Sequence, residues 1–289
     1  MRRLSPPRSG RRGLALAAIA CLFLAALVQG RFEARAAGRP GVHPLLYLPS
    51  GKYLRVAALG FDGILADAIY LWSIQYYGNF QIADRYHYLE QIYGQVIAEL
   101  DPQYLDPYLT GALIMTVEAR DAEMALRLLD KGIEKNPDAW ILAFEAGFVC
   151  YDDLKDYARA ARYFDKALQV PGCHPTVRHL YAEMYNRAGD KRASLREWAE
   201  IYETATDPYV RSAAWNHVHD LKVQVDLADL RTAVDGFSKQ EGRRPRHLRE
   251  LVSLGIVPVL PRDPEDRDYR YDPATGEVSY RGRLILVGF

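Results

Sequence analysis

The middle of the chain places apolar residues at intervals of three and four, with charged residues between them. Leu126, Leu129 and Ile133 follow this spacing, and so do Phe164 and Leu168. Because an α-helix has about 3.6 residues per turn, such residues lie on one face of a helix. The pattern therefore predicts amphipathic helices, each with an apolar stripe that must pack against a neighbour.

A short phrase occurs twice in this region. Residues 127–137 are RLLDKGIEKNP, and residues 162–172 are RYFDKALQVPG. Helix-breaking residues recur at nearly the same step of about 35 positions, a period typical of solenoids that stack one supersecondary unit. They are Pro102, Pro137, Gly172 and Pro208. We therefore expect paired antiparallel helices over residues 66–220.

Aromatic and small residues have a fixed order in the unit at about 141–172. They are Phe144, Gly147, Phe148 and Tyr151 in the first helix and Ala160, Phe164 and Ala167 in the second. In this order they resemble the Trp, Leu, Gly, Tyr, Ala, Phe and Ala of the tetratricopeptide repeat (TPR), a helix–turn–helix unit of about 34 residues. The resemblance implies an α–α superhelix whose groove binds another protein.

Neighbouring units match the repeat less fully. The unit before keeps Leu113, Ala125, Leu129, Gly132 and Pro137, with Thr116 at an aromatic position. The unit after keeps Tyr181, Ala182, Tyr185, Gly189 and Trp198, with Ser194 and Ile201 in place of alanines. A degenerate unit at about 70–102 keeps Gly78 and Pro102, as expected of an end unit that packs on one side.

The N-terminal residues 1–37 have the pattern of an export sequence. The first twelve residues hold five arginines and no acid, and an uncharged apolar run follows from Gly13 to Gly30. Arginines before such a run favour a cytoplasmic amino end. Its length fits either a cleaved signal peptide, with Ala34-Arg35-Ala36 as the cleavage region, or an uncleaved membrane anchor. Both place the body of the protein on the periplasmic side of the cell envelope.

Residues 38–65 are expected to be a linker and a capping segment. From about Tyr53 to residue 80 the sequence is strongly apolar. One broad helical face can hold Leu59, Ile64, Ala68, Leu71 and Ile74. We expect this face to pack against the solenoid as a capping helix and first-repeat helix. The competing hypothesis, suggested by its closeness to the apolar run, directs the face at the membrane or a membrane partner.

The pattern changes after Pro208. A long helical stretch is followed by a small α+β module, which we place at residues 225–289. The module begins in helix, continues with a short helix that stops at Gly255, and ends in three short strands joined by the turns DPATG and RG. The expected strands are Tyr269–Tyr271, Glu277–Tyr280 and Arg283–Val287.

About forty residues of this module resemble the carboxy-terminal region of type II secretion pseudopilins. The match is carried by Gly242, Pro245, Leu251, Pro261, Asp263, Pro264, Tyr269 and Tyr271. A pilin precursor has its processing glycine before the apolar segment and a glutamate within it, whereas Gly30 and Glu33 lie after the segment here. The chain is therefore not expected to be a filament subunit.

Charge argues against nucleic-acid binding. The totals of 37 basic and 37 acidic residues balance, so the chain beyond its arginine-rich start is mildly acidic. Nucleic-acid binding needs a basic surface that displaces counterions. Beyond the apolar run the cysteines are Cys150 and Cys173, which the repeat places too far apart along parallel helices for a disulfide. We expect two free, largely buried thiols.

Residues with catalytic or metal-binding chemistry are sparse. His217 and His219 point in opposite directions on a helix, His174 and His179 lack ligand partners at metal spacing, and no phosphate loop or nucleophile motif occurs. We expect no cofactor. Weak calcium candidates are the carboxylates Asp263, Asp266, Asp268 and Asp272, together with Glu265, which stand among arginines and favour a solvated loop.

These patterns favour a non-enzymatic protein–protein interaction scaffold of the cell envelope, with a secretion or pilus-assembly partner. The partner's helix or extended segment is expected in the concave face, near Tyr108, Thr116, Tyr151 and Tyr185. Tyr151 and Tyr185 also occupy the repeat's structural aromatic position, so packing is the competing interpretation. The alternatives are an enzyme or ligand-binding protein with an unrecognised site in the groove, a calcium-binding module, or an adaptor that self-assembles through the apolar 53–80 surface.

Overall fold

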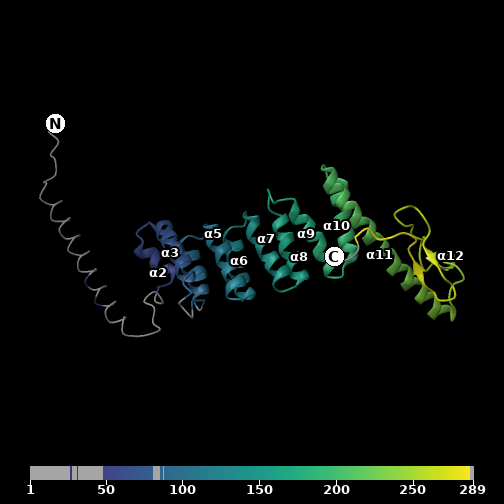
Figure 1. The fold of residues 1–289 in the computed structure, drawn as a ribbon, viewed down its shortest axis with the longest axis horizontal. Coiled ribbons are helices and arrows are strands. Elements are labelled where there is room, and N and C mark those ends of the chain that lie inside the picture. The colour runs from purple at the N-terminus through teal and green to yellow at the C-terminus, as the bar shows by residue number, and fades with distance from the viewer. Residues whose placement is uncertain (1–26, 28–30, 32–47, 81–84, 87, 287–289) are drawn as a thin grey trace. The chain divides into compact units, whose positions relative to one another are not determined.

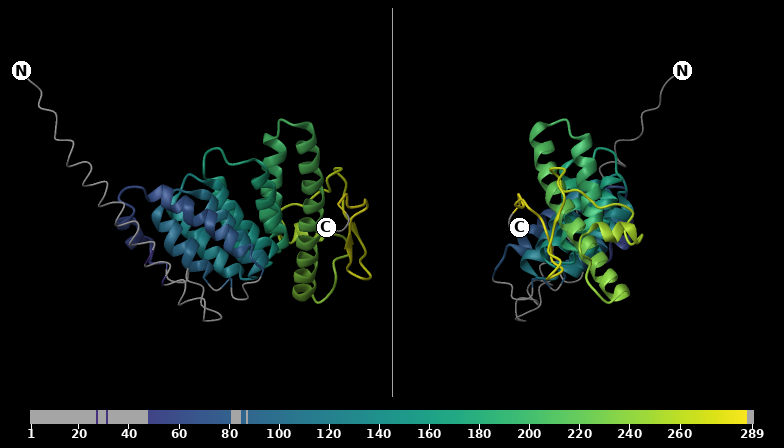
Figure 2. Two further views of the ribbon diagram at one scale, coloured as in Figure 1. Left: turned by 60° about the vertical axis from the view of Figure 1, so that its left-hand side comes forward. Right: turned by 90° about the vertical axis from the view of Figure 1, so that its right-hand side faces the viewer.

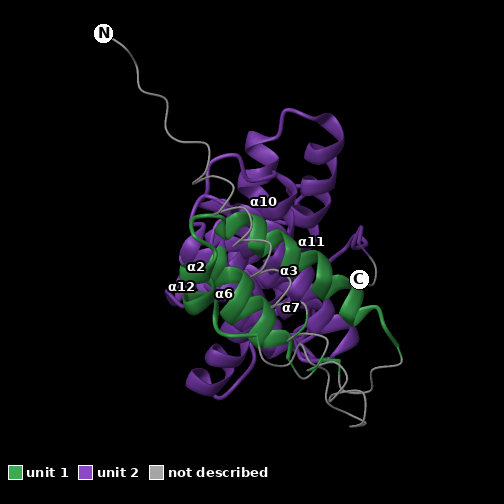
Figure 3. Cartoon of the chain, turned by 90° about the vertical axis from the view of Figure 1, so that its left-hand side faces the viewer, with its two compact units in different colours: residues 1–100 green, residues 101–289 purple. Residues whose placement is uncertain are grey.

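The computed structural model describes residues 27, 31, 48–80, 85, 86 and 88–286. The predicted signal peptide or anchor at 1–37 thus lies almost wholly outside the described residues. Among the described helices, none has the length and apolar content needed to cross a membrane. Figure 1 shows a mainly helical chain with a small two-stranded sheet near its C-terminal end. It divides into two compact units, residues 1–100 and 101–289, which Figure 3 colours separately.

The first unit packs its helices around a cluster of tyrosines. It contains α2 (Gly51–Ala57), α3 (Asp62–Tyr77), the π-helix η2 (Glu90–Ile97) and α4 (Ala98–Leu100). The ring of Tyr93 stacks on that of Tyr77 at 6.0 Å and meets Tyr70 edge-on at 6.4 Å. Ser73 donates a hydrogen bond to the Tyr93 hydroxyl at 3.1 Å, so the inner face of α3 is tied to η2.

In the second unit, helices that follow one another in sequence pack against one another. They are α5 (Leu105–Leu113) with the π-helix η3 (Ile114–Glu118), α6 (Ala122–Lys135), α7 (Trp140–Asp152), α8 (Tyr157–Leu168), α9 (Thr176–Arg187), α10 (Lys191–Thr204) and α11 (Pro208–Glu241). Figure 1 shows these helices side by side in chain order. The predicted mainly helical fold of packed neighbouring helices is confirmed.

An aspartate begins each second helix of the pairs. The carboxylates of Asp121, Asp156 and Asp190 accept a hydrogen bond at 2.9 Å from the backbone N–H three residues on, at the starts of α6, α8 and α10. Such N-caps satisfy one of the amide groups that a helix leaves unpaired at its first turn. The three caps follow one another at the repeat period, so the period sets where these helices start.

Small residues let the paired helices approach closely. A Cβ atom on Gly132 would lie 2.9 Å from the ring of Tyr108, and one on Gly147 would lie 2.6 Å from the ring of Phe164. Ala160 and Ala167 are fully buried. The sequence pattern predicted this packing role for Gly132, Ala160 and Ala167, because small side chains shorten the distance between helix axes.

Contacts between successive helix pairs involve the repeated phrase. Tyr163 donates a hydrogen bond to Asp130 Oδ1 at 2.8 Å, and Arg159 pairs with Glu123 at 2.7 Å. Asn136 Nδ2 donates to the carbonyl oxygen of Pro102 at 2.8 Å. The first two contacts join the pair α5–α6 to the pair α7–α8, and the third joins the end of α6 to the turn before α5 within one pair.

Helix α11 is continuous through the boundary region predicted at 220–225, but its apolar contacts change there. Its first half joins a core with Ala182, Trp198 and Ile201, which ends at Leu221. Its second half, from Val223, joins a separate core with Leu248, Leu251, Tyr269 and Val278. Figure 2 shows the C-terminal segment lying beside this second half.

After α11 the C-terminal module continues with a short helix and an antiparallel hairpin. After α12 (Arg249–Ser253), which ends before Gly255 at φ +69°, strand β1 (Arg270–Tyr271) pairs with β2 (Val278–Ser279). Both strands are shorter than predicted. The third predicted strand is wrong over its described part, because residues 283–286 pair with no strand. The amides of Ile285 and Leu286 donate to the carboxylate of Asp220 instead, and Val287 lies outside the described residues.

Candidate partner-binding surface

Four aromatic residues form a stripe along α7, which we call the α7 stripe. Trp140, Phe144, Phe148 and Tyr151 follow one another at helical spacing, with ring centroids 6.0, 6.3 and 5.8 Å apart. Phe148 is 41% exposed, and the other three rings are half-buried. A continuous row of accessible aromatic rings is the kind of surface that binds another protein.

The buried side of α7 adjoins the stripe, and Phe144 belongs to both, because its ring centroid lies 6.0 Å from that of Phe164 on α8. Ala143, Ala146, Gly147 and Cys150 are buried, and Gly147 allows close contact with Phe164 of α8. The sequence match assigned the family's glycine position to Phe148. In the structure, Phe148 lies on the exposed side of α7, and Gly147, one residue earlier, makes the close approach to Phe164.

The C-terminal end of the stripe meets positively charged side chains. The Arg187 guanidinium carbon lies 5.6 Å from the ring centroid of Tyr151 and 5.9 Å from that of Tyr157. Lys155 Nζ lies 5.8 Å from the Tyr151 ring. These distances are within range of cation–π attraction, which holds Arg187 of α9 against the end of the stripe.

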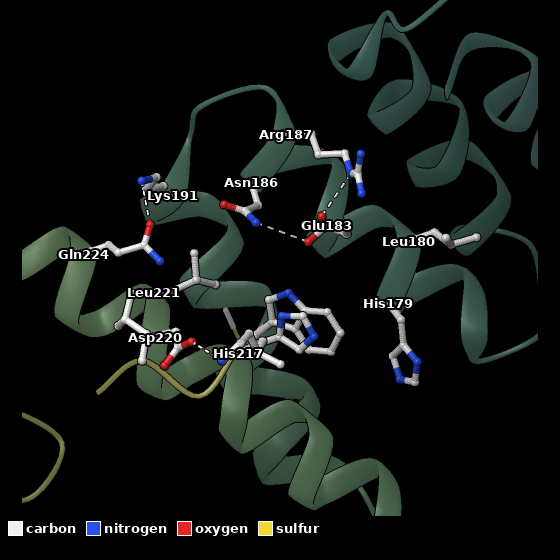
Figure 4. Close-up of a pocket in the computed structure, with 13 residues that line it drawn as sticks. His179, Leu180, Glu183, Asn186, Arg187, Lys191, His217, Asp220, Leu221 and Gln224 are labelled. Atoms are coloured by element: carbon white, nitrogen blue, oxygen red, sulfur yellow. Dashed lines mark hydrogen bonds and ion pairs between the residues drawn. The ribbon is translucent and has the colours of Figure 1, made fainter. Parts of the chain in front are cut away.

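Arg187 also borders a hollow of about 650 Å³ between α9, α10, α11 and the C-terminal segment, shown in Figure 4. Its Nε donates to Glu183 at 3.0 Å, and Lys191 donates to Gln224 at 2.6 Å across the hollow's rim. Arg187 therefore joins the α7 stripe to a hollow whose rim carries both hydrogen-bond donors and hydrogen-bond acceptors.

Stacked rings form one wall of the hollow. The imidazole of His217 lies parallel to the indole of Trp198, with centroids 3.8 Å apart, and His179 stacks on the same indole at 5.6 Å. Burial lowers the pKa of both His217 and His179, so both rings are neutral near pH 7. The wall is consequently flat and uncharged, as an apolar partner side chain requires.

Residues 284–286 form a second wall, and Leu284 and Leu286 line the hollow. Its backbone is held by Asp220, whose carboxylate accepts hydrogen bonds from the amides of Ile285 at 2.8 Å and Leu286 at 2.6 Å. Asp220 is 3% exposed and also contacts His219 Nδ1 at 2.7 Å.

His219 links α11 to the C-terminal module. Its Nε2 lies 3.0 Å from Glu265 and 3.1 Å from the Tyr280 hydroxyl. Burial lowers the pKa of His219, but hydrogen bonds to Asp220 and Glu265 outweigh burial, and the pKa lies above its ordinary value. Burial raises the pKa of Glu265, whereas its hydrogen bonds with Tyr280 and His219 bring it below its ordinary value. The two groups thus favour a charged pair.

The four predicted partner contacts divide into two pairs. Tyr151 is part of the α7 stripe, and Tyr185 is half-buried with its hydroxyl 2.9 Å from that of Tyr181. Tyr108 is 1% exposed and donates to the Pro102 carbonyl oxygen, while Thr116 is 9% exposed and donates back to its own helix. Tyr108 and Thr116 are interior groups, and we leave them out of the candidate surface.

The carboxylates considered for calcium have other partners. Asp263 is 3% exposed and accepts hydrogen bonds from the amides of Glu265 and Arg267 and from Arg267 Nε. Asp272 caps its turn through the Ala274 amide and the Thr275 hydroxyl, and Asp266 pairs with Arg262. Asp268 lies at an isolated bridge with Arg262. No group of three His, Cys, Asp or Glu residues within the described ranges is arranged to hold a metal ion.

Both cysteines of the body are free, as predicted. Cys150 is fully buried on α7, but Cys173 is only half-buried, because it lies in the turn before α9 rather than inside a helix pair. The expectation that both thiols are largely buried is therefore wrong for Cys173.

Sequence reasoning missed the surface roles of Phe144, Phe148, Glu183 and Arg187. The spacing of Trp140, Phe144, Phe148 and Tyr151 marks one helical face, and Glu183 and Arg187 are one turn apart. Their contacts across helices are visible only in the fold.

No protein-family model matches the chain, and comparison with curated proteins finds no relative.

Proposed function

We propose that this chain is a non-enzymatic interaction scaffold of the cell envelope, exported and tethered to the inner membrane by its N-terminal segment. Its packed helix pairs form a TPR-like superhelix, and the α7 stripe receives an apolar helix or extended segment of a protein partner. The observation that carries this proposal is the row of four rings that ends at Arg187.

The chemistry of the surface suits a peptide segment. Aromatic rings offer large contact areas at low cost in side-chain entropy, and they dominate the energetics of many interfaces. The rim of the hollow supplies Gln224 and Asn186, whose amides both donate and accept hydrogen bonds as a peptide backbone does. A partner that lies along α7 and reaches Arg187 therefore finds apolar contacts first and polar contacts at its end.

The context of this binding is secretion or pilus assembly. Its support is the resemblance of about forty C-terminal residues to pseudopilins, together with the arginine-rich start and apolar run of the sequence. The displaced glycine and glutamate argue that the chain assists such an assembly rather than joining it as a subunit.

Site-specific photo-crosslinking in cells tests the proposal. A benzophenone amino acid at Phe148 is expected to crosslink to one discrete protein, whereas the same group at Val259 is not. Val259 is 70% exposed in the C-terminal module and is the matched control. With the captured partner purified, Phe148→Ser is expected to weaken binding by about tenfold or more, and Val259→Ser to leave it unchanged.

Equal crosslinking from the two positions, or unchanged affinity of Phe148→Ser, overturns the proposal. Circular dichroism of both variants serves as the control for folding. Because Phe148 is partly exposed, we expect its loss to leave the helices intact.

The hollow favours a second candidate function, the binding of a small molecule. Its volume of about 650 Å³ and its Trp198–His217 wall are in the range of sites for small ligands. A small-molecule site would respond to His217→Ala but not to Phe148→Ser, whereas a partner lying along the stripe requires Phe148. Thermal-shift screening of the two variants separates the candidates.

A further inference from the structure

The described part of residues 1–100 has an exposed apolar surface at the turn between α2 and α3. Val56, Leu59, Phe61 and Ile64 are 77%, 84%, 66% and 68% exposed, and we call these four residues the α2–α3 tip. Single exposed apolar residues are ordinary, but a cluster of large ones at one turn marks an interaction surface.

Helix α3 continues this surface, because it is apolar on both sides. Its inner side is buried against η2 through Ala66, Ile69, Tyr70, Ser73 and Tyr77. Its outer side exposes Leu71 and Ile74, which follow Ile64 at helical spacing. Asp67 lies among these residues on the outer side, but its large apolar neighbours lack the cover that apolar residues on a helix normally have.

The backbone of the turn holds the tip outward. Leu59 has φ +52° and Gly60 has φ +91°. The left-handed region suits glycine but disfavours a side chain such as that of leucine. A leucine that is both disfavoured by its backbone and 84% exposed adds nothing to the core, which is typical of a residue kept for an external contact.

Charged residues flank the tip, and Asp62 follows directly after Phe61. Lys52 is about one helical turn before Val56, and Asp67 is nearly one turn after Ile64. Arg55 donates to the carbonyl oxygens of Glu99 and Leu100 and lies 4.0 Å from Asp62. The acid nearest the tip is therefore partly neutralised, and Lys52 is the charge that suits anionic lipid headgroups.

We propose that the α2–α3 tip inserts into the surface of the phospholipid bilayer. This step rests on the proposed membrane attachment, because the apolar run ends at Gly30 and α2 begins at Gly51. The twenty residues between them can span at most about 70 Å, so the tip stays within reach of the bilayer. Tethering gives even a weakly binding patch a high effective concentration of lipid.

The depth of insertion follows from the tip's composition. Apolar side chains of interfacial segments reach about 5–10 Å into the headgroup and acyl boundary. Leu59 and Phe61 suit that layer, while Lys52 suits the anionic headgroups above it. The apolar run itself and a second copy of the chain are the competing occupants of the tip, and the experiment separates them.

The test uses the full chain in phosphatidylethanolamine–phosphatidylglycerol vesicles, with or without brominated acyl chains. Phe61→Trp adds an indole at the tip, and Tyr209→Trp adds one at an 87% exposed aromatic position of α11. After subtraction of the parent emission, the indole at position 61 is expected to be blue-shifted and quenched by brominated lipid. The indole at position 209 is expected to be neither.

A third variant checks specificity. Leu59→Asp in the Phe61→Trp background is expected to remove the quenching while the chain still floats with the vesicles. Aspartate tolerates the left-handed region, so the turn is kept. Circular dichroism checks that the helices remain.

Each other outcome overturns the insertion. An indole at position 61 that emits as in water shows an uncovered tip. A blue-shifted but unquenched indole shows cover by the apolar run or, where the shift depends on the protein-to-lipid ratio, by a second copy. A chain that does not float contradicts the proposed membrane attachment as well, whereas a floating chain with an unquenched tip contradicts insertion alone.

Discussion

Gly147 lies so close to Phe164 that a single added carbon on Gly147 would fall 2.6 Å from the phenylalanine ring. The ring is fully buried, so it has no open space to move into. This contact sets the distance between α7 and α8. Phe144 of the α7 stripe lies 6.0 Å from the same ring, so the position of the stripe depends on how α7 packs against α8. The partner-binding surface proposed above thus depends on a residue that is not part of it.

Gly147→Ala is expected to destabilise the protein by about 1–3 kcal/mol, because it overpacks a closed core. The higher helix propensity of alanine, which is worth about 1 kcal/mol, offsets only part of this cost. The free energy of unfolding in urea, followed by circular dichroism, provides the measurement.

Gly236→Ala is the matched control. Gly236 is an exposed glycine inside α11, and nothing lies within 4 Å of a Cβ atom built on it. The same substitution there is expected to stabilise by about 0.5–1 kcal/mol. A stabilising Gly147→Ala would show that α7 and α8 lie farther apart than described.

The helical fold could be predicted because period, helix breakers and residue size all agree in the middle of the chain. Asp121, Asp156 and Asp190 recur at the same period, so their role as N-caps could also have been predicted from the sequence. The register within α7 could not be predicted, because Gly147 and Phe148 are adjacent and only the contact with Phe164 decides which of them faces α8.

The candidate surface was less predictable than the fold. A position on the first helix of a pair did not distinguish Tyr108, which is covered beneath Gly132, from Tyr151, which meets Arg187. The apolar residues at 284–286 suggested a strand. Instead, the amides of Ile285 and Leu286 donate to the carboxylate of Asp220, more than sixty residues earlier. Such long-range contacts leave no local pattern.

His219 is expected to make stability depend on pH. Because its pKa is raised in the folded state, its contribution is complete below the ordinary histidine value of about 6.5 and is lost as pH rises through the folded value. The stability lost in His219→Gln should therefore be larger at pH 6 than at pH 9, as measured by urea unfolding.

His217 provides the opposite case on the same helix. Burial lowers its pKa, so its contribution is present above about 6.5 and is lost as pH falls through the folded value. His217→Gln should then lose more stability at pH 8 than at pH 5. The same pH trend in both variants would contradict the described environments.

Asp263 is expected to stabilise the C-terminal module without calcium. Asp263→Ala removes a buried carboxylate with three hydrogen bonds and should cost on the order of 2–4 kcal/mol. Asp268→Ala, at an exposed position of the same loop, should cost less than about 1 kcal/mol. Thermal unfolding measures both. Millimolar calcium should not shift the midpoint of the unsubstituted protein, whereas a calcium-dependent rise would indicate a site.

The two thiols of the body are expected to react at very different rates. Burial raises the pKa of the Cys150 thiol to about 12, although the Arg159 guanidinium acts in the opposite direction. Burial also raises the pKa of Cys173, but that side chain is only half-buried. Since the thiolate is the reactive form, a maleimide should label Cys173 in the folded protein and Cys150 only after unfolding in urea. Mass spectrometry of peptides after timed labelling gives both rates, and equal rates in the folded protein would show that α7 is open at Cys150.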